Sequence, residues 1–134
     1  MNRIRLLFVL VTLFLAACGP APVKAPPDGT YARDEITSSG TNKLAIVLNK
    51  GQFAMDSQGS PLWQGTYQVV GNKLVFKSLT NSVLGSAYCG SKDDFSYLWT
   101  YDSSRQQLKF TQDNDSCVAR MSGALGGAWT FQPG

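Results

Sequence analysis

The sequence contains no histidine among its 134 residues, and charge of either sign is scarce. The absence of histidine excludes Ser-His-Asp and Cys-His catalytic arrangements and zinc sites that use imidazole ligands. The chain has 12 basic and 9 acidic residues, scattered along its length. Without Arg3 and Arg5, which precede the domain, 10 basic residues remain against 9 acidic ones. Such a balance gives no electrostatic footprint for nucleic acid, and we expect no nucleic-acid partner.

Long hydrophobic runs are also missing. The longest one extends from Leu6 to Ala16, is interrupted by Thr12 and has about 11 residues, whereas a membrane-spanning helix needs about 20. Arg3 and Arg5 precede this run, and small residues follow it. A basic start, a short apolar centre and small residues before a cleavage site are typical of a secretory signal peptide, which we place at residues 1–17.

The tetrapeptide Leu15-Ala16-Ala17-Cys18 resembles the lipobox of bacterial lipoproteins. The resemblance implies cleavage before Cys18 and attachment of three acyl chains to that residue. Two chains already anchor a protein stably, so three make the attachment effectively permanent. The residue after the cysteine is Gly19 rather than aspartate, which by the sorting rule of that family implies the outer membrane, with the domain facing the periplasm.

Only three cysteines are present, which limits the disulfide framework to one bridge once Cys18 carries lipid. In an oxidising periplasm the remaining pair, Cys89 and Cys117, predicts a disulfide. That bridge closes a loop of about 29 residues and stabilises the domain by about 3–4 kcal/mol in the chain-entropy description. The alternative is a pair of free buried thiols.

Helix-forming patterns are missing as well. Residues 19–28 contain four prolines in ten positions and predict, with Cys18, a semi-extended tether over residues 18–28. From residue 29 the pattern is that of eight to ten short strands, at 29–36, 43–49, 51–57, 63–70, 73–78, 95–101, 107–112, 117–122 and 128–132, with a loop at 37–42. Asn49-Lys50-Gly51 and Gly71-Asn72 are hairpin signals. We expect an all-β domain at residues 29–134, an antiparallel meander closed into a barrel of about eight strands.

Several motifs in this domain resemble the small lipocalin-like (calycin-type) domains of bacterial lipoproteins. They are Tyr-x-Val-x-Gly-Asn-x-Leu-x-Phe at 67–76, Cys89, Tyr97-x-Trp99, Leu108-x-Phe110, Asp115-x-Cys117-x-x-Arg120 and a late tryptophan, Trp129. The resemblance covers most of residues 29–134. It implies a lipocalin-like barrel, whose interior is wide enough for packed side chains or for one small ligand.

Aromatic residues alternate in the segment FSYLWTY, which holds Phe95, Tyr97, Trp99 and Tyr101. Alternate side chains of a strand point to opposite faces, so we expect these four rings to face inward and Ser96 and Thr100 to face solvent. Three interpretations of the aromatic wall stay open: a filled core, a ligand-lined cavity or an outward patch for a partner. The candidate ligand-binding residues are Trp63, Tyr67, Tyr97, Trp99 and Arg120.

Three further segments carry open questions. Arg120 lies between Ala119 and Met121 in an expected strand and points either into the barrel, toward an aromatic ring or a carboxylate, or outward. Asp113-Asn114-Asp115 offers too few oxygens for calcium and is expected to be a solvated hairpin tip. The connection 79–94 is longer than a hairpin needs and is either a lid, with Val83, Leu84 and Tyr88, or a missed strand.

No catalytic residue, metal site or cofactor is indicated. We therefore expect a non-enzymatic, lipid-anchored envelope protein that binds a small hydrophobic ligand or an envelope component. The alternative is a protein-interaction module, such as a hydrolase inhibitor or an envelope-stress sensor. An internal cavity beside Tyr97 and Trp99 favours the first function, and a filled barrel with an exposed apolar loop at 79–94 favours the second.

Overall fold

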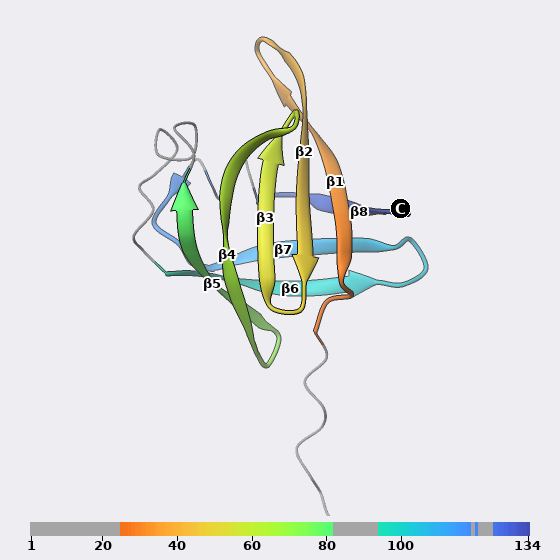
Figure 1. The fold of residues 1–134 in the computed structure, drawn as a ribbon. Coiled ribbons are helices and arrows are strands. Elements are labelled where there is room, and N and C mark those ends of the chain that lie inside the picture. Colours follow the sequence, from red (N-terminus) through yellow and green to blue (C-terminus); the bar gives the residue numbers. More distant parts are fainter. Residues whose placement is uncertain (1–24, 82–93, 119, 121–124) are drawn as a thin grey trace, which may run out of the picture.

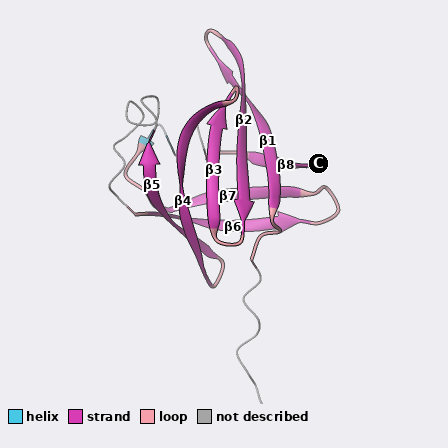
Figure 2. Ribbon diagram, in the orientation of Figure 1, coloured by secondary structure: helices cyan, strands magenta, loops and turns pink. Residues whose placement is uncertain are grey.

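The computed structural model describes residues 25–81, 94–118, 120 and 125–134. These residues form eight strands: β1 (Gly29–Thr37), β2 (Gly40–Asn49), β3 (Gln52–Ser57), β4 (Ser60–Val70), β5 (Lys73–Asn81), β6 (Phe95–Asp102), β7 (Gln107–Asn114) and β8 (Ala128–Gln132). Within the described ranges no helix is long and apolar enough to cross a membrane. Figures 1 and 2 show that strands make up almost all of this part of the chain.

Each strand pairs antiparallel with the next one along the chain, and β8 returns to β1 to close the barrel. Closure is short: Thr30, Tyr31 and Ala32 of β1 pair with Gln132, Phe131 and Thr130 of β8. Closure removes the open edges that such a meander would otherwise expose. The predicted all-β fold, a closed antiparallel barrel of about eight strands, is therefore confirmed and is consistent with a lipocalin-like barrel (Figure 1).

Tight turns connect the strands at one end of the barrel. Lys50 and Gly51 both have positive φ, 46° and 81°, which is the conformation of a two-residue turn whose twist matches that of the flanking strands. Gly71, at φ 64°, begins the β4–β5 turn, as the sequence predicted. The chain enters β1 at this same end, where the Tyr31 hydroxyl donates to the Pro27 carbonyl at 2.6 Å and Asp28 Oδ1 accepts from the Lys50 amide at 3.0 Å.

The predicted loop at 37–42 is wrong. β1 and β2 remain paired as far as Thr37 and Gly40, so only Ser38 and Ser39 lie between them. The hydroxyl of Thr37 lies 3.0 Å from that of Ser39 and donates to the Gly40 carbonyl, and these local bonds replace the loop. The hairpin extends past the rest of the barrel, as Figure 1 shows, and its Ile36 side chain is 88% exposed.

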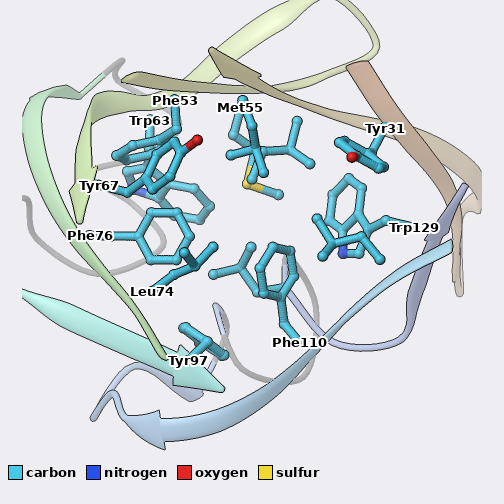
Figure 3. Close-up of a cluster of buried hydrophobic side chains, with 14 of the residues drawn as sticks. Tyr31, Phe53, Met55, Trp63, Tyr67, Leu74, Phe76, Tyr97, Phe110 and Trp129 are labelled. Atoms are coloured by element: carbon cyan, nitrogen blue, oxygen red, sulfur yellow. The ribbon is translucent and has the colours of Figure 1, made fainter. Parts of the chain in front are cut away.

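The barrel interior is filled by side chains that alternate along the strands. Leu44, Ile46 and Leu48 of β2 are buried, whereas Val47 between them is 36% exposed. Phe76 of β5 lies at the centre of an aromatic cluster (Figure 3). Its ring centroid is 5.0 Å from that of Phe53 in β3 and 6.2 Å from that of Phe110 in β7. Ring contacts therefore cross the barrel from one wall to the other.

Candidate functional site

The only pair of opposite charges that the described residues bury completely is Arg120 with Asp115. Arg120 Nε donates to Asp115 Oδ2 at 2.6 Å, and Nη2 donates to Oδ1 at 2.7 Å. The two side chains are 4% and 0% exposed. Both donors lie on one edge of the planar guanidinium and meet the two carboxylate oxygens in parallel, which is the strongest geometry available to this pair.

Asp115 accepts two more hydrogen bonds. The Tyr97 hydroxyl donates to Oδ2 at 2.6 Å, and the Cys117 amide donates to Oδ1 at 2.9 Å. Burial alone would raise the pKa of Asp115, but the bonds from Arg120, Tyr97 and the Cys117 amide outweigh burial and hold this pKa below its usual value. With all four donors in place, Asp115 is a saturated structural anion and has no free oxygen with which to accept a proton from a substrate.

Aromatic rings complete the surroundings of Arg120. Its guanidinium carbon lies 3.9 Å from the centroid of Phe95 and 5.8 Å from that of Trp63. Cation–π attraction in a desolvated setting is worth about 2 kcal/mol. We call the set of these residues the Arg120 cluster: Trp63, Phe95, Tyr97, Asp115 and Arg120. Asp115 pairs with the edge of the Arg120 guanidinium, and the rings of Phe95 and Trp63 lie against its face.

Of the two positions left open for Arg120, the structure shows the inward one, but the strand predicted at 117–122 is wrong. Residues 115–118 and 120 are not in a strand. The Arg120 amide donates to Cys117 Sγ at 3.3 Å, and the Arg120 carbonyl accepts from the Leu125 amide at 2.7 Å, so the chain turns here. The turn brings Arg120 back over Asp115, five residues earlier.

Three of the five predicted ligand-binding residues, Trp63, Tyr97 and Arg120, come together in this cluster. Tyr67 lies apart from it, with its ring 6.2 Å from that of Phe76, and burial raises the pKa of its hydroxyl. Trp99 pairs with Phe110 across β6 and β7 and packs, half-buried, against the core. The predicted set therefore divides between the Arg120 cluster and the general core.

Asp115 was missed, because the sequence predicted a solvated hairpin tip at 113–115. Asp113 and Asn114 are exposed as predicted, but the prediction is wrong for Asp115. β7 continues to Asn114, and Asp115 is 6% exposed. The signal that could have identified it is Arg120 itself, since a buried arginine requires a carboxylate or an equivalent acceptor nearby. The turn that makes them neighbours leaves no periodic pattern in the sequence.

Strand β6 confirms the aromatic wall but corrects one of its polar residues. Phe95 and Tyr97 are buried, Trp99 and Tyr101 pack against the core, and Thr100 is exposed, all as predicted. Ser96 was expected to face solvent but is 6% exposed. The register between β6 and β7 shifts at Ser96 and Tyr97, and the displaced Ser96 hydroxyl donates to Asp113 Oδ2 at 2.6 Å.

Of the three cysteines, only Cys117 is among the residues that the structure describes. Cys117 is buried and disulfide-bonded. Cys89 and Cys18 lie outside the described residues, so the Cys89–Cys117 pairing and the lipid on Cys18 stay predictions. Val83, Leu84 and Tyr88 also lie outside these residues, whereas residues 79–81 are the end of β5 rather than part of a loop.

A shallow depression of about 450 Å³ lies on the outer face of β2, β3 and β4. Its lining is uncharged and includes Val47, Ala54, Gln64 and Thr66. The predicted cavity beside Tyr97 and Trp99 is not where this depression lies. In the described part of the chain no group of three or more histidine, cysteine, aspartate or glutamate side chains could hold a metal ion.

No family model, no curated protein and no solved structure matches this chain.

Proposed function

We propose that this chain is a lipid-anchored protein of the bacterial envelope and that its barrel is a non-enzymatic binding module. The anchor is Cys18 in the outer membrane, and the barrel faces the periplasm. The motif Leu15-Ala16-Ala17-Cys18 supports the anchor. The contacts of Pro27 and Asp28 with the barrel also fit this arrangement, because they fasten the end of the tether to the tight-turn end of the domain.

The packed interior supports recognition through the outer surface over enclosure of a ligand. Phe76 is fully buried and contacts rings from opposite walls, and the Arg120 cluster occupies further interior space. A small apolar ligand would have to displace these rings, and closely packed cores resist such a change. Recognition of an envelope protein through the outer surface is therefore favoured, as in an inhibitor or a sensor. Enclosure of a small hydrophobic ligand by Trp63, Tyr67, Tyr97, Trp99 and Arg120 becomes the second candidate.

A disulfide between Cys89 and Cys117 belongs to the same proposal. The bonded state of Cys117 supports it, and an oxidising compartment favours such a bridge.

The anchor is tested by Cys18→Ser in cells fed a labelled fatty acid. We expect the label to disappear from the protein and the unprocessed precursor to accumulate, while Cys89→Ser, which leaves the lipobox intact, retains the label. Equal labelling of the Cys18→Ser chain would refute the anchor.

The binding mode is tested by placing a photo-reactive side chain at Ala54, which is exposed in the outer depression. Illumination of intact cells should give a discrete cross-linked protein, and the same group at exposed Thr100 should not. Native mass spectrometry of the purified chain tests the enclosed-ligand function. A stoichiometric apolar compound that is retained through purification would restore the enclosed-ligand function.

A further inference from the structure

Arg33 is a second inward-pointing arginine, and it differs from Arg120 in having no carboxylate. It lies on β1 just past the last pair with β8, on the same face as the buried Tyr31. Its guanidinium carbon lies 5.3 Å from the ring centroid of Trp129. Trp129 is fully buried on β8, so the Arg33 side chain lies over the wall of the barrel interior.

Two donors of Arg33, Nε and Nη2, are buried and have no hydrogen-bond partner. They are the same two atoms with which Arg120 binds Asp115. In the part of the chain that the structure describes, every orphaned buried polar side-chain atom is a donor, the others being the indole nitrogens of Trp63, Trp99 and Trp129. Among the described residues, the buried side-chain atoms left without partners are therefore donors and not acceptors.

An orphaned charge of this kind is costly. Burial without a partner disfavours the charged form, and burial lowers the pKa of Arg33, against a smaller opposing effect of Glu35. Glu35 contacts Arg33 in none of the ion pairs that the described residues form. A methionine or leucine would pack on Trp129 without this penalty. Exceptional buried groups of this kind require an explanation, and they cluster at functional sites.

The third nitrogen, Nη1, faces Gly127. A Cβ built on Gly127 would lie 3.1 Å from Nη1, and Gly127 has φ +84°, which disfavours any other residue. The backbone therefore approaches the guanidinium closely on this side, and Nη1 is not among the buried side-chain atoms without a partner. The Arg33 residue as a whole is partly exposed, whereas its Nε and Nη2 atoms are buried.

We propose that Arg33, held flat by the ring of Trp129, is a binding subsite for the carboxylate of a small-molecule acid. The Nε–Nη2 edge takes both oxygens, as Arg120 takes those of Asp115. Binding replaces the packing contacts that cover the edge in the free protein. This inference rests neither on the lipid anchor nor on the outer depression. The Arg33 subsite can fail while the proposed function holds, and the proposed function can fail while the subsite holds.

The test uses the full chain in a neutral detergent, with acetate as the probe and sodium chloride holding the ionic strength constant. The readout is the ¹H–¹⁵N resonance of Arg33 Nε, assigned by its loss in Arg33→Lys. We expect a saturable shift with acetate, and at least about a tenfold loss of affinity in Arg33→Lys, because lysine cannot present two coplanar donors. Arg105→Lys, which changes an exposed arginine, is the matched control and should bind acetate as the parent does.

Thermal unfolding supplies the second measurement. If Arg33 serves binding, Arg33→Met should leave the Tm unchanged or raise it and should abolish the acetate-dependent shift of a tryptophan indole resonance. A lower Tm in Arg33→Met would mean a structural role and overturn the proposal. The absence of a saturable Arg33 shift would also overturn it. Tighter binding of inorganic phosphate than of acetate would overturn the assignment to a carboxylate.

Discussion

Arg120 donates two parallel hydrogen bonds, of 2.6 and 2.7 Å, to Asp115, and the two residues are only five positions apart in the chain. The pair therefore closes a short turn at the end of β7 and fixes it against Phe95 of β6. A buried ion pair is not by itself evidence of stability, because desolvation offsets much of the attraction. Removing only one partner nevertheless costs stability, because it leaves the other charge buried and unpaired. Single substitutions can therefore test the pair.

Arg120→Met should destabilise the domain by about 3–5 kcal/mol, since it leaves Asp115 charged, buried and without its main partner. The double variant Arg120→Met with Asp115→Leu should recover part of that loss, because neither charge remains. Urea unfolding followed by circular dichroism measures both. A single variant as stable as the parent would contradict the central role assigned to this pair.

Acid should weaken the domain through Asp115. Its folded pKa is held below that of an unfolded aspartate, about 3.9, so in acid the unfolded state binds more protons than the folded one. The stabilisation is thus complete above about pH 4 and is lost as the pH falls through the folded pKa. The Tm of the parent should drop as the pH falls below about 4, more steeply than that of Asp115→Asn. Asp34→Asn, which alters an exposed side chain, should follow the parent curve.

Tyr97→Phe isolates one bond of the network. The phenyl ring keeps the contact with Phe110, whereas the hydroxyl that donates to Asp115 at 2.6 Å is lost. Hydrogen bonds to charged groups contribute about 1.5–3 kcal/mol, so a loss in that range is expected in urea unfolding. Tyr101→Phe serves as the control, because its side chain is half-buried and lies outside the Arg120 cluster. Equal losses of stability in the two variants would show that the bond from the Tyr97 hydroxyl to Asp115 makes no special contribution.

The barrel was predictable because strand periodicity and turn chemistry are local. Alternation in 95–101 identified the inward face of β6, and Asn49-Lys50-Gly51 identified a turn from its glycine. The burial of Ser96 was not predictable, because the register shift at Ser96 and Tyr97 depends on β7 rather than on the sequence of β6. The extended hairpin at 37–42 was missed because Ser38-Ser39 is not one of the Asn-Gly, Asp-Gly or Gly-Gly pairs that mark a two-residue hairpin turn.

The candidate site was less predictable than the fold. Arg120 was singled out as a charge between apolar neighbours. Arg33 on β1 did not stand out in this way, because Asp34 and Glu35 follow it and the three residues resemble a charged surface segment. Asp115 was invisible for a different reason. Its partner reaches it through a turn, and turns bring residues together without periodicity.

A disulfide at Cys117 predicts a defined loss of stability. Cys89→Ser should destabilise the domain by about 3–4 kcal/mol if it removes a bridge that closes about 29 residues. Mass analysis of the native protein without reductant should show a mass two hydrogens below that of the reduced chain. Alkylation of two thiols in protein taken directly from the envelope would disprove the bridge, whatever the stability of the variant.

Trp99 tests whether the aromatic wall is a core or a contact surface. It is half-buried, packs against the core opposite Phe110, and its indole nitrogen is buried without a partner. Truncation of a core tryptophan costs about 3–5 kcal/mol, and the partial exposure of Trp99 places Trp99→Ala near the lower end of that range. Trp99→Phe should lose less, because it keeps a ring on Phe110. A neutral Trp99→Ala variant would show that the ring contributes no packing energy. The part of β6 around Trp99 would then be a contact surface for a partner rather than the edge of the core.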